Sequence, residues 1–236
     1  MEISVYRYDP EKDKAPYTQA FEVDMPDGRD LMVLDVLELI KEIDPTVSYR
    51  RSCREGVCGS DGVNMNGKNG LACITPISDV AKRGKLSIKP LPGLPVIRDL
   101  VVDMEQFYDS YKKIQPYLIR DDSELESDER EFLQSPEEVE QYIQFANCIK
   151  CGLCNSACPT MATDSSFVGP QALAQAYRYV ADSRDKGKDT RLNIIDESHG
   201  IWRCHFAGSC SQVCPKGVDP AMGIQFLRGY LLGFRS

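Results

Sequence analysis

The stretch 148–159, CIKCGLCNSACP, constrains this chain more than any other, because its cysteines follow the spacing C-x2-C-x2-C-x3-C-P. In that spacing three thiolates bind corners of one iron–sulfur cubane, and the fourth cysteine binds a different cluster. Pro159 redirects the chain directly after the fourth cysteine. A partner run is present at Cys204, Cys210 and Cys214-Pro215. The sequence therefore predicts a fold that brings two distant cysteine runs together around metal.

Composition narrows the class of protein further. Ten cysteines would suggest disulfides in a secreted protein, but the segment 1–7 has no apolar signal core. We therefore expect reduced, intracellular, metal-bound thiols. No run approaches the roughly 18 apolar residues of a membrane span, so we expect contact with a membrane only through partner subunits. The net charge of −8 argues against a nucleic-acid-binding protein.

The first part of the chain, residues 1–105, is predicted to be a small α+β domain. Alternating apolar residues predict strands over 3–8 and 17–23, which form a hairpin, and a third strand over 86–89. A helix is predicted over 31–43 with Asp30 as its cap. Asn66-Gly67 is a hairpin turn signal. A sheet with one packed helix is therefore the expected architecture.

The second part, residues 106–236, is predicted to be helical. The apolar spacing predicts helices over 101–117, 137–145 and 171–182, and a further helix from Asp219-Pro220 onward. The stripe formed by Val101, Met104, Tyr108 and Tyr111 is expected to face the core. The acidic run 121–131 is expected to be an exposed surface segment.

A first metal centre is predicted between the helix 31–43 and the strand 86–89. Its spacing resembles the plant-type [2Fe–2S] pattern C-x4-C-x2-C…C, with an aspartate in place of the third cysteine. The predicted ligands are Cys53, Cys58, Asp61 and Cys73. Nearby glycines at 56, 59 and 62 would let backbone N–H groups approach the cluster. Asp61 has an alternative role, because a loop aspartate can instead accept a hydrogen bond from a neighbouring backbone amide.

The second cysteine run lacks one cysteine of the pattern, because Ala207 stands where it should be. If the last cysteine of each run binds the other cluster, a [4Fe–4S] cluster has the ligands Cys148, Cys151, Cys154 and Cys214. The remaining thiolates, Cys158, Cys204 and Cys210, suit a [3Fe–4S] cluster that lacks one corner. The competing interpretation keeps four irons and places water or His205 on the odd one.

The motifs resemble the iron–sulfur subunits of succinate dehydrogenase and fumarate reductase over essentially the whole chain. The segments that carry the resemblance are 51–62, 64–67, 72–73, 90–92, 148–159, 182–185 and 204–215. The resemblance implies a plant-type ferredoxin-like (β-grasp) domain followed by an all-α bacterial-ferredoxin-like domain. It also implies a heteromeric membrane complex, with FAD on a flavoprotein subunit and a quinone at a membrane anchor that could carry haem.

In such a complex electrons would pass from FAD to [2Fe–2S], [4Fe–4S], [3Fe–4S] and then quinone. The resemblance places Pro159, Thr160 and His205 beside the quinone. Either menaquinone or ubiquinone could serve, but Met161-Ala162-Thr163 stand where some ubiquinone-reducing members carry a tryptophan, which favours menaquinone. The predicted location is the cytoplasmic face of a prokaryotic membrane, as a peripheral part of the complex.

Two alternative interpretations of the cysteines remain, and the first belongs to another class of protein. A zinc-stapled interaction module would use the same cysteines as structural ligands, although zinc sites are built from separated pairs. A related iron–sulfur subunit could instead serve another flavin dehydrogenase, such as a glycerol phosphate dehydrogenase. The resemblance implies no substrate-transforming site on this chain itself. The sequence motifs of this chain include neither a catalytic dyad nor a nucleotide-binding loop.

Overall fold

Residues 1–25, 30–120 and 131–235 are described by a computed structural model, in which the chain divides into two units. The first unit comprises Met1–Met104 together with Ile149–Ala157. The second comprises Glu105–Cys148 and Cys158–Ser236. The predicted domain boundary at 105/106 stays a prediction, because these units describe packing and the first of them also takes in the segment 149–157.

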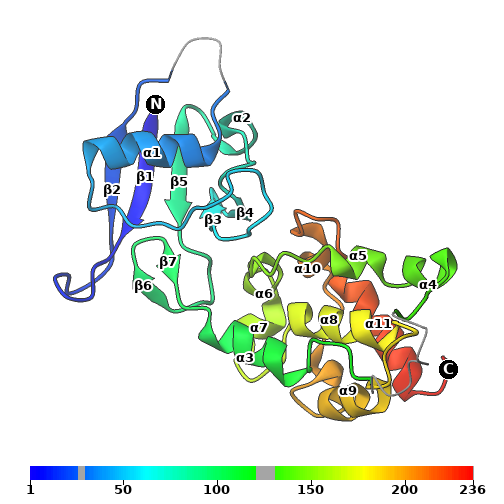
Figure 1. Ribbon diagram of the computed structural model, residues 1–236. Coiled ribbons are helices and arrows are strands. Elements are labelled where there is room, and N and C mark those ends of the chain that lie inside the picture. Colours follow the sequence, from blue (N-terminus) through cyan, green and yellow to red (C-terminus); the bar gives the residue numbers. More distant parts are fainter. Residues whose placement is uncertain (26–29, 121–130, 236) are drawn as a thin grey trace. The chain divides into compact units, whose positions relative to one another are not determined.

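The first unit is built on a five-stranded sheet with the strand order β2-β1-β5-β3-β4. The strands are β1 (Glu2–Arg7), β2 (Tyr17–Glu22), β3 (Gly62–Met65), β4 (Lys68–Leu71) and β5 (Lys85–Lys89). β1 pairs antiparallel with β2 and parallel with β5. Helix α1 (Val33–Ile43) lies across β2, β1 and β5 (Figure 1). This mixed sheet crossed by one helix is the predicted β-grasp arrangement.

Buried and partly exposed residues alternate along β1, so one face of the sheet packs into the hydrophobic core. Ile3 and Val5 are fully buried on one face, and Arg7 follows them at 6% exposure. Burial of a guanidinium is tolerated where carboxylates pair with it. Here Arg7 Nε donates to Asp99 Oδ1 at 3.0 Å and Nη1 donates to Asp44 Oδ2 at 2.9 Å. These bonds join β1 to the end of α1 and to the segment after β6 (Val96–Arg98).

The predicted cap of α1 is wrong. The backbone N–H of Met32 donates to Asp35 Oδ2 at 3.0 Å, so the acid inside the first turn satisfies the helix start. Asp30 instead accepts from the backbone N–H of Ser78 at 3.2 Å, next to α2 (Ile77–Val80). The carboxylate of Asp30 therefore bonds a segment distant in sequence, which local capping rules do not foresee.

The hairpin between β3 and β4 confirms the turn predicted at Asn66-Gly67. Asn66 has φ 48° and Gly67 has φ 89°, as a two-residue turn with both central residues left-handed requires. Strands β3 and β4 themselves were not predicted, because four residues give too little alternation to identify a strand. The last strands of the unit, β6 and β7 (Val101–Val102), form a separate antiparallel pair.

Every regular element described in the second unit is a helix. The helices are α3 (Glu105–Lys113), α4 (Pro136–Glu140), α5 (Ile143–Ala146), α7 (Pro159–Thr163), α8 (Pro170–Val180), α9 (Lys188–Ile195), η2 (Ile201–Arg203), α10 (Ser209–Gln212) and α11 (Pro220–Leu231). The short helix α6 (Leu153–Ser156) belongs to the first unit. α8 is the centre of the core, and its Tyr177 ring packs edge-on against Phe145 of α5 with centroids 4.8 Å apart.

The starts of α8 and α11 are as predicted. Pro170 is the first helical residue after Gly169, and Asp219 caps α11 by accepting from Met222 N at 2.9 Å. The predicted helix over 137–145 is interrupted instead, with α4 ending at Glu140 and α5 beginning at Ile143. The acidic run falls largely on residues 121–130, which lie outside the described residues.

The helix predicted over 101–117 is shorter in the structure. Val101 and Val102 pair as β7, so the helix begins at Glu105 and ends at Lys113. The predicted core stripe is wrong at Tyr108, which is 43% exposed, whereas its neighbour Phe107 is 2% exposed. Tyr111 does pack against the hydrophobic core. Strand pairing of the first two residues moved the start of the helix and with it the residues that face inward.

Candidate metal centres

The loop after α1 holds one sulfur atom among backbone donors. Cys53 Sγ accepts from the backbone N–H groups of Glu55 at 3.5 Å, Cys58 at 3.2 Å and Val57 at 3.3 Å. These donors lower the pKa of Cys53 to about 7. Because the thiolate is the form of cysteine that binds metal, the loop favours a ligand at this position.

Asp61 and Cys73 lie together in the interior of the same unit. Asp61 is 4% exposed and Cys73 is 7% exposed. Burial, and then the adjacent Asp61 carboxylate, raise the pKa of Cys73 to about 12. Asp61 Oδ2 accepts from the backbone N–H of Cys73 at 2.6 Å, whereas its buried Oδ1 has no hydrogen-bond partner among the residues described. The hydrogen bond from a backbone N–H, which was the alternative role of Asp61, is therefore present. The second carboxylate oxygen, Oδ1, remains and fits a metal ligand.

Gly59 gives this loop a conformation that a larger residue would not share. Its φ is +69°, and a Cβ added there would lie 2.9 Å from the carbonyl oxygen of Ile149 and 3.0 Å from Cys151 Cβ. Both the left-handed backbone and this close approach require glycine. The loop that bears Cys58 and Asp61 therefore packs directly on the segment 149–157 within the first unit.

The two cysteine runs share one backbone conformation. Lys150 and Phe206, each two residues after the first cysteine of its run, both have φ 57°. Gly152 and Gly208 follow at φ 79° and φ 76°, and each is the N-cap of a short helix, α6 or α10. Non-glycine residues with positive φ are uncommon, so the repeat is informative. It places Ala207 at the position that Cys151 occupies in the first run.

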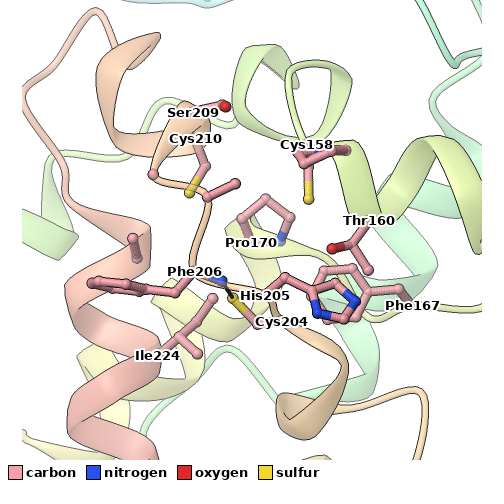
Figure 2. Close-up of a pocket in the computed structure, with 14 residues that line it drawn as sticks. Cys158, Thr160, Phe167, Pro170, Cys204, His205, Phe206, Ser209, Cys210 and Ile224 are labelled. Carbon is pink, nitrogen blue, oxygen red and sulfur yellow. Dashed lines mark hydrogen bonds between the residues drawn. The ribbon is translucent and has the colours of Figure 1, made fainter.

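Cys158, Cys204 and Cys210 line one cavity in the second unit together with Ala207 and His205. Figure 2 shows their sulfur atoms around this cavity, between α7, α10 and α11. Cys204 Sγ accepts from the backbone N–H of Phe206 at 3.4 Å. Burial raises the pKa of Cys210, which is 8% exposed. The three thiols assigned to the third centre are thus brought together by the fold.

The residues expected beside the quinone line the same cavity. Pro159 and Thr160 belong to the start of α7, and Thr160 is 3% exposed. His205 lines the cavity as well and is exposed. Ala207 is exposed as well, which leaves room for a larger side chain at its position.

The other four cysteines are divided between the units. Cys148 and Cys214 pack against the hydrophobic core of the second unit, whereas Cys151 and Cys154 belong to the first. Within the described ranges, no three His, Cys, Asp or Glu side chains are grouped so that they could hold a single metal ion.

Sequence reasoning missed a polar cluster formed by Asp164, His199 and Arg203. Asp164 Oδ2 accepts from His199 Nδ1 at 2.9 Å and from Arg203 Nε at 2.8 Å. The bond from His199, followed by that from Arg203, lowers the pKa of Asp164. Asp164 directly follows α7, which begins after Cys158, and Arg203 directly precedes Cys204. The cluster therefore ties together two of the segments that bear cysteines, and no spacing in the sequence signals it.

Two family models match the chain. One covers the part with the predicted [2Fe–2S] ligands, and the other covers the part with the two cysteine runs. The model described as "2Fe-2S iron-sulfur cluster binding domain" matches residues 2–109. The model described as "4Fe-4S dicluster domain" matches residues 144–218. None of the helices in the described part of the chain is long and apolar enough to cross a membrane.

Named relatives match almost the entire length of the chain. The succinate dehydrogenase iron–sulfur subunit of Coxiella burnetii is 45% identical, over 98% of this chain and 97% of the relative. The fumarate reductase iron–sulfur subunit of Mycobacterium tuberculosis is 46% identical, over 95% of this chain and 89% of the relative. A chain of the Mycobacterium smegmatis Sdh1 complex in the apo form has the same fold, with a TM-score of 0.85, 23% identity and coverage of 99% and 96%.

Proposed function

Because the chain belongs to the family of succinate dehydrogenase and fumarate reductase iron–sulfur subunits, we propose that it carries electrons between the FAD of a flavoprotein subunit and a membrane quinone. Its [2Fe–2S] and [4Fe–4S] dicluster domains are those of an electron-transfer subunit of a succinate:quinone oxidoreductase. When bound, the clusters supply one-electron transfer, and succinate or fumarate reacts on the flavoprotein.

The [2Fe–2S] cluster is assigned to Cys53, Cys58, Asp61 and Cys73. The backbone amides around Cys53 and the buried Asp61 Oδ1 support this assignment, because the cluster brings negative charge that donors stabilise and cationic iron that carboxylates bind. Gly59 permits the approach of the segment 149–157.

The [4Fe–4S] cluster is assigned to Cys148, Cys151, Cys154 and Cys214 from the spacing in the sequence. The third centre is assigned to Cys158, Cys204 and Cys210 as [3Fe–4S]. The observation that carries the [3Fe–4S] assignment is the repeated backbone conformation of the two runs, because it aligns Ala207 with Cys151. An alanine side chain has no lone pair to bind iron, so one corner of a cubane would lack its ligand.

The quinone is assigned to the exposed side of the three-cysteine cavity, beside Pro159, Thr160 and His205. The support for this placement is that all three residues line the cavity and that His205 is exposed. The imidazole of His205 can donate a hydrogen bond or a proton to a quinone oxygen as the quinone is reduced. Menaquinone is favoured over ubiquinone by Met161-Ala162-Thr163.

The partners are assigned as a FAD-containing flavoprotein and one or more membrane anchor subunits, with the possibility of haem in the anchor. The chain would then be a peripheral part of a membrane-anchored complex on the cytoplasmic face of a prokaryotic membrane. Support comes from the names of the relatives, which are subunits of larger enzymes.

Purification of the native complex tests this function most directly. We expect a brown complex that contains a flavoprotein, an anchor and quinone, with EPR signals of three different clusters and with succinate:quinone activity. A colourless, diamagnetic protein would instead support the zinc-stapled module. A flavoprotein that oxidises glycerol phosphate rather than succinate would identify the other flavin dehydrogenase.

A further inference from the structure

Gln171 is a polar side chain in the most buried part of the second unit. It is 2% exposed, and every residue of α8 from Pro170 to Tyr177 is buried. Its Nε2 lies 4.0 Å from the sulfur of Cys148. A side-chain amide in such an interior is costly unless its polar atoms have partners. The cysteine sulfur supplies one of those partners, and it belongs to a proposed cluster ligand.

A second glutamine one turn later provides a comparison within the same helix. Gln175 is 4% exposed, and its Nε2 donates to the carbonyl oxygen of Phe145 at 2.8 Å. Residues four apart lie on the same face of a helix, so both amides point toward the segment 145–148. Gln175 binds the backbone of that segment, whereas Gln171 contacts its thiol. The two positions therefore separate support of the segment from an effect on the sulfur.

The charge of a bound cysteine determines which end of the amide faces it. A thiolate repels the oxygen of a side-chain amide and attracts its N–H group, which is the orientation in the structure. Reduction adds negative charge to an iron–sulfur cluster. A donor or a positive dipole end near a cluster sulfur therefore stabilises the reduced form and raises the potential.

We propose that Gln171 raises the reduction potential of the cluster that Cys148 binds. The inference rests on the proposed function, since it takes Cys148 as a ligand of the [4Fe–4S] cluster. Gln171 acts through the thiolate and does not itself touch iron. Loss of its N–H group should lower the equilibrium constant for reduction by about threefold to tenfold, the range of a single neutral hydrogen bond. A tenfold change is about 59 mV for a one-electron couple.

The test is an EPR-monitored redox titration of the purified complex. Gln171→Met removes the donor with little change of volume, and Gln175→Met is the matched control on the same helix face. We expect the midpoint of the [4Fe–4S] signal to fall in the first variant and to stay unchanged in the second. The midpoints of the other two clusters should stay unchanged in both. If the methionine variant loses cluster, Gln171→Asn keeps an amide with a shorter reach and should give a smaller fall.

Unchanged [4Fe–4S] midpoints in Gln171→Met, or in Gln171→Asn if only that variant assembles, would overturn the inference. So would a shift of the three-iron midpoint in place of the four-iron one, or an equal shift in the Gln175 control. Cys148→Ser separates this failure from failure of the ligand assignment. If Cys148→Ser leaves the [4Fe–4S] spectrum unaltered, Cys148 is not a ligand. If it alters the spectrum while Gln171→Met has no effect, only the role of Gln171 is wrong.

Discussion

The two cysteine runs have the same backbone in different surroundings. In the first, a Cβ added to Gly152 would lie 2.8 Å from Met104 Cε, and Leu153 is fully buried. In the second, a Cβ added to Gly208 would meet nothing within 4 Å, and His205, Phe206 and Ala207 are exposed. The left-handed residues determine the turn in both runs, and the side chains around it differ. The same turn therefore lies in a packed environment in the first run and in an exposed one in the second.

The largest expected effect comes from the packing on the first run. Gly59→Ala adds a left-handed alanine, which costs about 1–2 kcal/mol, and a backbone clash with Ile149, which adds about 1–3 kcal/mol. We expect a clear fall in the midpoint temperature at which the visible absorption is lost. Gly208→Ala is the matched control, because it carries the same backbone cost with open space around the new Cβ. Equal midpoints for the two variants would contradict the difference in surroundings.

The exposure of the second run predicts the next largest effect. His205→Ala should slow quinone reduction on the order of a hundredfold, the size of a lost general acid. Succinate oxidation with an artificial acceptor at the flavin should be retained. Both rates are measured on the assembled complex. Equal loss of both activities would mean that His205 supports assembly rather than quinone reduction.

Asp164 tests whether the second run depends on contacts from outside it. Asp164→Asn weakens the hydrogen bonds to His199 and Arg203. We therefore expect the EPR signal of the oxidised [3Fe–4S] cluster to be lost severalfold faster on warming. Because the pKa of Asp164 is lowered in the fold, its contribution is present at neutral pH and is lost only as the pH falls below the usual aspartate value of about 3.9. The difference in the rate of signal loss between Asp164→Asn and the wild type should therefore have its maximum size at pH 7.

Asp196→Asn is the control for this prediction. Asp196 accepts from Trp202 Nε1 at 2.6 Å in the same region but does not bond α7. Its replacement should leave the rate of signal loss near that of wild type. If both variants lose the signal equally fast, the Asp164 cluster has no special role in holding the cysteine-bearing segments.

The smallest effect is expected in the loop that packs on the first run. Asp61→Asn keeps an oxygen for the backbone N–H of Cys73 but replaces the charged carboxylate proposed to bind iron with a neutral amide. We expect a changed line shape or midpoint of the [2Fe–2S] EPR signal, with the other two signals unchanged. An identical spectrum would show that Asp61 serves only to bond the backbone.

Local patterns predicted much of this fold, and distant contacts explain what they missed. The alternation of β1, the turn at Asn66-Gly67 and the starts of α8 and α11 depend on neighbouring residues, and each is present. The start of α3 depends on strand pairing, and the partner of Asp30 lies far along the chain.

The candidate sites divide in the same way. Cysteine spacing grouped Cys158, Cys204 and Cys210, and these three residues line one cavity. That they bind one cluster stays a prediction. The contacts of Asp164 and Gln171 could not be predicted, since residues far apart in the sequence make them only after the helices pack.

In the proposed assignment, Ala207 leaves the third centre with three irons. Iron analysis and EPR of the purified wild-type complex and of Ala207→Cys test it most directly, since the exposed position has room for a thiol. We expect an oxidised-state [3Fe–4S] signal in the wild type, replaced in the variant by a reduced-state [4Fe–4S] signal of lower potential. A wild-type protein that already holds two four-iron clusters would contradict it.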